Sequence, residues 1–311
     1  MLRSSPPDVS GVTIACDDPL VRQLVEDWLR DAEMAWPGPF SITVLTGDVC
    51  PFDTDDRDGI PQVGISVQAG APLHTVRITW EDAPAVAVVD ATEAKATLWM
   101  SPAALRQFDA AERSFLLVML VFVMRRVGWY HVHAASLVDR GRRGWLIAGN
   151  SNCGKSTTTA LMATQGWQVA TDDIGFLVRD GERIASVGMR TPVALRPGGL
   201  AMLGASGGID MSRRQKSGFW PEDLGGAWTP RVIPEIVAFP TIGERTALTP
   251  TTPREALAAI VRWSVWVLYE PAFAQEHLDA LGMLARQSRC FHLTLGPDLF
   301  EHPSLLEELA S

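Results

Sequence analysis

The feature that most constrains this chain is the segment 149–156, which reads Gly-Asn-Ser-Asn-Cys-Gly-Lys-Ser. Gly149 and Gly154 frame four residues, and Lys155 and Ser156 follow directly. This spacing is typical of a phosphate-binding loop. The glycines let the backbone curl so that several N–H groups point at one anion, and a helix starting there adds the positive end of its dipole.

The neighbouring sequence supports this interpretation. An apolar stretch, Trp145–Ala148, predicts a strand before the loop, and Ser156–Thr164 predicts a helix after it, stopped by Gly166. A glycine-rich turn that binds nothing is the alternative. The residues expected to contact nucleotide phosphates are Gly149, Asn150, Ser151, Asn152, Cys153, Gly154, Lys155, Ser156 and Thr157.

Two acids follow the next predicted strand, 167–171: Asp172 and Asp173. The helix should rise about 1.5 Å per residue away from the loop, roughly 16 Å in all. The strand should return at about 3.3 Å per residue, again roughly 16 Å. Both carboxylates should therefore lie beside the phosphate loop, where they can hold Mg²⁺ or accept a proton. The alternative is a pair that caps a helix or forms a turn.

The strand predicted before the loop contains two histidines on one face, His131 and His133, in the sequence His-Val-His-Ala-Ala-Ser-Leu-Val. The order His-Ala-Ala-Ser-Leu-Val, phosphate loop, Asp-Asp resembles the catalytic domain of bacterial HPr kinase/phosphorylase. It resembles more closely the HPr-kinase-related proteins, including kinases of modified-peptide pathways such as lasso-peptide kinases. The resemblance covers roughly 131–200 and extends weakly through 233–240 and 290–295.

The resemblance implies an α/β fold, a P-loop kinase domain of the HPr kinase/PEP carboxykinase type. It implies an ATP-dependent kinase that transfers the γ-phosphoryl group to a hydroxyl, a serine on a peptide or protein. Lys155 would neutralise the β and γ phosphates, and Ser156 and Asp173 would ligate Mg²⁺. Asp172 would act as general base on the acceptor, and His133, rather than the other histidine, would lie near the transferred group.

The sequence departs from the protein kinase proper in the segment 189–199, which contains no acidic residue. We therefore do not expect HPr itself as the acceptor. Arg196 is either a phosphate partner or a surface arginine. The segment 206–231 has no clean period and predicts a mobile loop, which either folds over an acceptor peptide or is a plain surface loop. Its cationic and aromatic residues are Arg213, Arg214, Lys216, Trp220 and Trp228.

The region before the resemblance predicts a separate N-terminal α+β domain, 1–127, followed by the catalytic domain, 128–311. A helix is expected at 21–34 and another over 110–127. We expect this domain to dock a partner or form a homo-oligomer. Its predicted strands are Ser41–Leu45, Val63–Val67, Thr75–Trp80, Ala85–Val89 and Ala96–Met100.

Composition excludes other classes of protein. The net charge is −9 without a basic block, which argues against nucleic-acid binding. The longest apolar run, Phe115–Met124, is too short to span a bilayer and predicts a buried helix. The four cysteines are scattered, and no signal peptide is visible, so we expect a cytoplasmic protein. Two alternative functions remain: an ATPase switch or assembly protein, and a non-catalytic nucleotide sensor or peptide-binding module.

Overall fold

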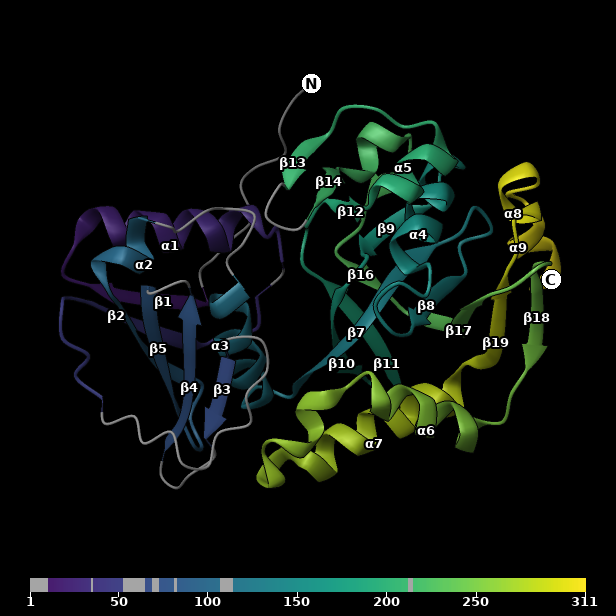
Figure 1. Cartoon of the computed structure of the whole chain (residues 1–311). Helices are drawn as coiled ribbons and strands as arrows, with labels where there is room; N and C mark the ends of the chain where they lie inside the picture. The colour runs from purple at the N-terminus through teal and green to yellow at the C-terminus, as the bar shows by residue number, and fades with distance from the viewer. Residues whose placement is uncertain are drawn as a thin grey trace. The chain divides into compact units, whose positions relative to one another are not determined.

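The structure is a computed structural model that describes residues 11–34, 36–52, 65–68, 73–80, 83–106, 114–211 and 215–311. The chain divides into two compact units, Met1–Trp129 and Tyr130–Ser311. Both are mixed α/β and contain parallel strand pairs (Figure 1). Each is described on its own below.

The N-terminal unit contains a six-stranded sheet in the order β1-β2-β6-β5-β4-β3. The pairs β1–β2 and β2–β6 are parallel, and the remaining pairs are antiparallel. β1 was not predicted, and residues 63 and 64 of one predicted strand lie outside the described residues. The strands are β1 (Val12–Cys16), β2 (Phe40–Thr46), β3 (Ile65–Gln68), β4 (Leu73–Trp80), β5 (Ala83–Asp90) and β6 (Lys95–Met100).

Helices α1 (Pro19–Asp31), α2 (Pro102–Arg106) and α3 (Ser114–Arg125) complete this unit. Asp18 caps α1, because its carboxylate accepts hydrogen bonds from the N–H groups of Leu20 and Val21 at 2.9 and 3.3 Å. The segment 118–124 of α3 is buried on every side, as predicted from its unbroken apolar sequence. The predicted residues 110–113 of this helix lie outside the described part.

The C-terminal unit is built on a ten-stranded sheet. Its main path is β16-β11-β10-β7-β8-β17-β19-β18, and β9 and β15 branch from β7. The strands are β7 (Trp129–Val138), β8 (Gly144–Ala148), β9 (Gln168–Thr171), β10 (Ile174–Asp180), β11 (Arg183–Gly188), β15 (Ala227–Trp228), β16 (Arg231–Val232), β17 (Pro234–Ile242), β18 (Ala247–Pro250) and β19 (Arg289–Leu295).

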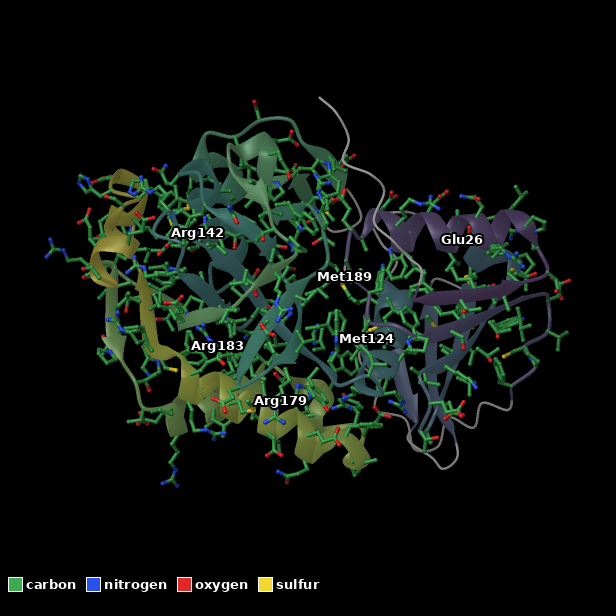
Figure 2. All side chains as sticks on the ribbon, turned by 180° about the vertical axis from the view of Figure 1, so that it is seen from behind. Glu26, Met124, Arg142, Arg179, Arg183 and Met189 are labelled. Carbon is green, nitrogen blue, oxygen red and sulfur yellow. The ribbon has the colours of Figure 1, made fainter. Side chains whose placement is uncertain are left out.

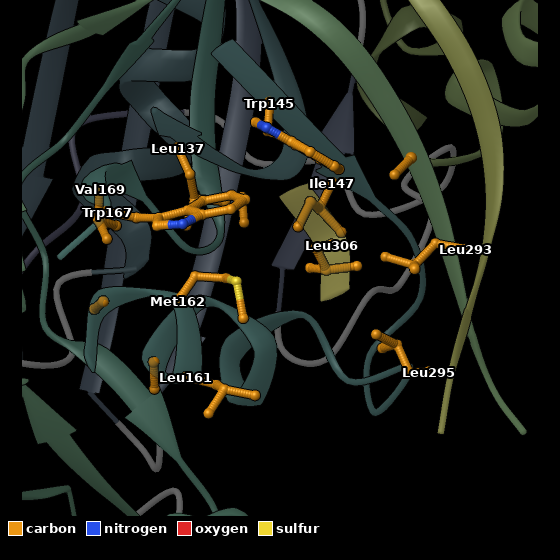
Figure 3. Close-up of a cluster of buried hydrophobic side chains, with 14 of the residues drawn as sticks. Leu137, Trp145, Ile147, Leu161, Met162, Trp167, Val169, Leu293, Leu295 and Leu306 are labelled. Carbon is orange, nitrogen blue, oxygen red and sulfur yellow. The ribbon is translucent and has the colours of Figure 1, made fainter. Parts of the chain in front are cut away.

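Both faces of this sheet are buried, which explains the continuous apolar sequence of β8. Trp145 and Ile147 point to one face and pack with Met162 of helix α4 (Lys155–Thr164) and with Trp167 (Figure 3). Leu146 and Ala148 of β8 point to the other face, toward α6 (Pro253–Arg262) and α7 (Pro271–Gln287). The short helices α8 (Asp298–Glu301) and α9 (Leu305–Leu309) end the chain.

The hairpin of β7 and β8 is held at its turn by the buried carboxylate of Asp139. This carboxylate accepts hydrogen bonds from the Trp145 indole at 3.0 Å and from the Arg143 guanidinium at 2.8 Å. Arg142, labelled in Figure 2, occupies the left-handed region at φ 67° in the same turn. The turn fixes the register of the hairpin, and the open end of the hairpin lies at the opposite edge of the sheet.

The prediction of a mobile loop over 206–231 is wrong for the residues that the structure describes. Strands β13 (Ile209–Met211) and β14 (Lys216–Phe219) pair with β12 (Val193–Leu195) in a small antiparallel sheet, and a 3-10 turn, β15 and the start of β16 follow. Each of these strands has at most four residues, so the alternation of apolar and polar residues is too short to be recognised in the sequence. Arg213 and Arg214 lie outside the described residues.

Other elements of this unit differ from what their local sequence predicts. β17 continues through Pro240, because parallel pairing with β19 extends to Ile242. The sequence of 253–270, rich in Trp and Val, predicts one helix, but α6 ends at Arg262 and a 3-10 turn follows at Val265–Leu268. The helix α7 was missed, as was the hairpin of β10 and β11. None of the helices in the described part of the chain combines the length and apolar character needed to cross a bilayer.

Replacing Trp167 by alanine should lower the free energy of unfolding by about 3–5 kcal/mol. Trp167 is 1% exposed, and its ring lies 5.4 Å from that of Trp145, so truncation leaves a cavity under α4. Urea unfolding followed by circular dichroism measures the loss. M202A is the control, because Met202 is 54% exposed and should cost less than about 0.5 kcal/mol. A loss below about 1 kcal/mol in W167A would contradict this packing.

Candidate functional site

The central strand β7 brings the predicted site residues together. β7 pairs antiparallel with β8 and also with β9, so β8 and β9 run parallel to each other. The carboxyl ends of β8 and β9 therefore reach the same edge of the sheet, where β7 begins. The phosphate loop follows β8, the Asp pair follows β9, and His133 lies near the start of β7. Asp172 and Asp173 thus lie beside the loop, as predicted.

The loop has the backbone that its glycines allow. Gly154 precedes α4 with φ 98°, a left-handed conformation that disfavours other residues, and Asn152 also has a positive φ of 68°. A Cβ at Gly149 would lie 2.8 Å from the sulfur of Cys153, so the loop closes tightly on itself. The curled backbone places the first N–H groups of α4 at the mouth of the loop.

Lys155 is the most buried cation of the site, with 6% of its surface exposed. Its Nζ donates to the carbonyl oxygens of Gly149 at 2.6 Å and Asn150 at 3.0 Å. The same Nζ lies 3.1 Å from Nε2 of His133. Burial, the largest cause, lowers the pKa of Lys155, and the charges of the neighbouring acids oppose this effect.

His133 connects this lysine to the second acid. Its Nδ1 lies 3.0 Å from Oδ1 of Asp173. Burial lowers the pKa of His133, and Lys155 lowers it further, while Asp173 raises it. The neutral ring satisfies both contacts in one tautomer, in which Nδ1–H donates to Asp173 and Nε2 accepts from Lys155. A continuous chain of polar contacts therefore runs from Asp173 through His133 to the phosphate loop.

Asp172 occupies a different environment from its neighbour. It is 4% exposed, whereas the Asp173 side chain is 47% exposed. Its Oδ2 accepts a hydrogen bond from the Ala194 N–H at 3.3 Å, and its carboxylate is hydrogen-bonded to Ser156. Burial, aided by the charge of Asp173, raises the pKa of Asp172 to about 6. This carboxyl can therefore exchange a proton near neutral pH.

The structure separates several residues that the sequence could only group. Ser156 is hydrogen-bonded to Asp172, and the role that the resemblance implies for Ser156 and Asp173 as Mg²⁺ ligands stays a prediction. His131 packs edge-on against Phe176, with ring centroids 5.9 Å apart, and is 7% exposed. Arg196 is exposed and occupies the N-cap position of α5 (Pro197–Leu203).

The sequence did not indicate that Lys216 belongs to the site. Lys216, at the start of β14, interacts electrostatically with His133, Lys155 and Asp172. The sequence placed it in a loop with two arginines, and only the pairing of β14 with β12 brings it to the site. Sequence periodicity could not have found it, because the strand has four residues.

The donor set of this site suits a hard cation bound jointly with phosphates. Within the ranges that the structure describes, no group of three or more His, Cys, Asp or Glu side chains could hold a metal alone. Mg²⁺ in phosphate sites takes one or two protein oxygens and completes its shell with phosphates and water. The hydroxyl of Ser156 and the adjacent carboxylates provide such oxygens.

Comparison with known proteins finds likenesses among solved structures. No family model matches the chain, and no curated protein matches it. Among solved structures, it is similar to the Hpr(Ser) kinase/phosphatase from Coxiella burnetii, with 14% identity and a TM-score of 0.31. The match covers 58% of this chain and 93% of that one.

Replacing Asp172 by asparagine should stabilise the protein above pH 6. The carboxyl has a pKa of about 6 in the folded chain against an ordinary value of 3.8, so the folded state binds the proton more tightly. Wild-type stability therefore falls as the pH rises from about 4 to about 6, while the neutral amide is unaffected. We expect D172N to gain about 1–3 kcal/mol at pH 8 and almost nothing at pH 4.

Urea unfolding at both pH values, without nucleotide and with a metal chelator, measures this difference. D210N is the control, because Asp210 is an exposed carboxylate on β13. A gain in D172N that is equal at pH 4 and pH 8 would show that Asp172 does not titrate as described.

Proposed function

We propose that this protein is an ATP-dependent phosphotransferase that moves the γ-phosphoryl group to a hydroxyl. The observation that carries the proposal is the meeting of the loop lysine, a histidine and two acids at one sheet edge. A loop of this kind binds the phosphates, and acids beside it are placed to act on an incoming hydroxyl.

The chemical step is an in-line displacement at the γ-phosphorus. The acceptor oxygen forms a bond to phosphorus, and the bond from phosphorus to the bridging oxygen breaks. ADP leaves with that electron pair. The hydroxyl proton passes to the carboxylate of Asp172, whose raised pKa suits it to accept a proton near neutral pH. Lys155 exchanges its loop carbonyls for phosphate oxygens and holds the charge of the leaving diphosphate.

His133 orients the site in this proposal. It receives the Lys155 ammonium on one ring nitrogen and donates to Asp173 with the other, so both charged groups are held by one ring. Ser156 and Asp173 would hold Mg²⁺ together with the phosphates. The cation, when bound, neutralises charge on the β and γ phosphate oxygens.

The acceptor class rests on the sequence resemblance. We propose a serine on a peptide or protein, with the N-terminal unit serving to dock that partner or to join copies of the chain. The absence of an acid from the segment 189–199 argues against HPr as the acceptor.

The test of this function is incubation of the purified protein with labelled ATP, Mg²⁺ and candidate acceptors, including any short peptide encoded beside its gene. Mass spectrometry then locates the phosphorylated hydroxyl. D172N should lower transfer at least 100-fold and keep its affinity for ATP, because the base is lost and the phosphate contacts remain. K155A should weaken both ATP binding and transfer. Normal transfer rates in D172N would overturn the assignment of the base.

The two acids should respond differently to magnesium. D173N should need at least tenfold more Mg²⁺ for half-maximal transfer, because it removes an oxygen proposed to bind the cation. Excess Mg²⁺ should not restore D172N, in which the proton acceptor is missing. Transfer rates measured across a Mg²⁺ titration compare the two variants, with D210N as the control. An unchanged Mg²⁺ requirement in D173N would remove Asp173 from the metal site.

The same assays separate the two alternative functions. Steady ATP hydrolysis that no acceptor alters would favour an ATPase switch. Tight nucleotide binding without turnover, unaffected by D172N, would favour a nucleotide sensor.

A further inference from the structure

Lysine is rare in this chain, and its placement is informative. Of 27 cationic side chains, 24 are arginine, and the lysines are Lys95, Lys155 and Lys216. Lys95 is an exposed residue of the N-terminal unit that pairs with Glu93. The other two belong to the candidate site. The candidate site therefore contains two compact ammonium groups with freely rotating donors, in a chain whose other cationic residues are nearly all arginine.

The strand pairing of the small sheet fixes the direction of Lys216. β14 pairs with β12 so that Val193 faces Phe219 and Leu195 faces Ser217. Val193, Leu195 and Phe219 are buried in the core beneath α4. Because side chains alternate along a strand, Lys216 points to the opposite face, away from this core.

The small sheet is also bonded to the edge of the large sheet where Asp172 lies. The Ala194 N–H of β12 donates to the carboxylate of Asp172, so the β12–β14 pair is anchored directly at the acids. The glycine at position 199 approaches the loop helix as well, since a Cβ there would lie 2.9 Å from the hydroxyl oxygen of Thr157. These two attachments hold the strand that carries Lys216 beside the phosphate loop.

The ammonium of Lys216 forms no ion pair within the described part of the chain. Among the described residues, no hydrogen bond or ion pair involves its half-buried side chain, although its charge acts on His133, Lys155 and Asp172. Lys155, by contrast, already has three polar contacts. A half-buried ammonium that forms no ion pair with the described residues, next to a loop whose backbone suits phosphates, is available to bind an incoming anion.

We propose that Lys216 is a second cation of this site and that its ammonium binds the terminal phosphoryl group of a nucleoside triphosphate. This inference rests on the proposed function. Charge in phosphoryl transfer spreads over the three outer oxygens of the γ-phosphoryl group, and one lysine in the loop cannot surround them. Lys216 reaches those oxygens from β14 and stabilises them during transfer.

The test compares triphosphate and diphosphate binding by calorimetry in the full chain. A non-hydrolysable ATP analogue and ADP, each with Mg²⁺, are titrated into the wild type, K216M and K216Q. The contact is specific to the third phosphate, so both variants should lose at least tenfold in affinity for the analogue and less than threefold for ADP. K95M, the control, should match the wild type for both ligands.

Equal losses for the two ligands, or no loss, would overturn the proposal. A raised KM for the acceptor with unchanged affinity for the analogue would also overturn it, because Lys216 would then bind the acceptor. Two neutral variants are used so that a folding defect in one, seen as a lower melting temperature, leaves the other informative. Failure of the wild type to bind nucleotide would instead overturn the proposed function itself.

Discussion

The antiparallel strand β7, paired with both β8 and β9, is the constraint on which the site depends. It makes its two neighbours parallel without their touching, so the loop after β8 and the acids after β9 reach one edge. The start of β7 supplies His133 between them, which bridges Lys155 and Asp173. The apolar residues on both faces of β8 pack between helix layers and keep this arrangement rigid.

The local parts of the site were predictable from the sequence, and the pairing of distant strands was not. The loop motif and the strand–helix–strand lengths placed Asp172 and Asp173 beside the loop, because these quantities depend only on neighbouring residues. Nothing local showed that β7 inserts between β8 and β9, or that four residues at 216–219 form a strand. The helix α7 was not predicted although it has 17 residues.

Asp172 shows how stability and chemistry oppose each other here. Its carboxylate is almost fully removed from water, which raises the pKa and weakens the fold near neutral pH. The hydrogen bonds from Ser156 and the Ala194 N–H offset part of that cost. Asparagine would keep the contact with the Ala194 N–H without the charge, so the cost of the acid agrees with the proton-accepting role proposed for it.

The contacts of the loop lysine also bear on how a ligand enters. The ammonium of Lys155 has a shell of three partners, two carbonyl oxygens of its own loop and the imidazole of His133. An arriving phosphate must displace that shell, and the exchange subtracts from the affinity gained. In the proposed function these contacts compete with the ligand, which disfavours weak anions such as free phosphate and favours ligands with several linked phosphates.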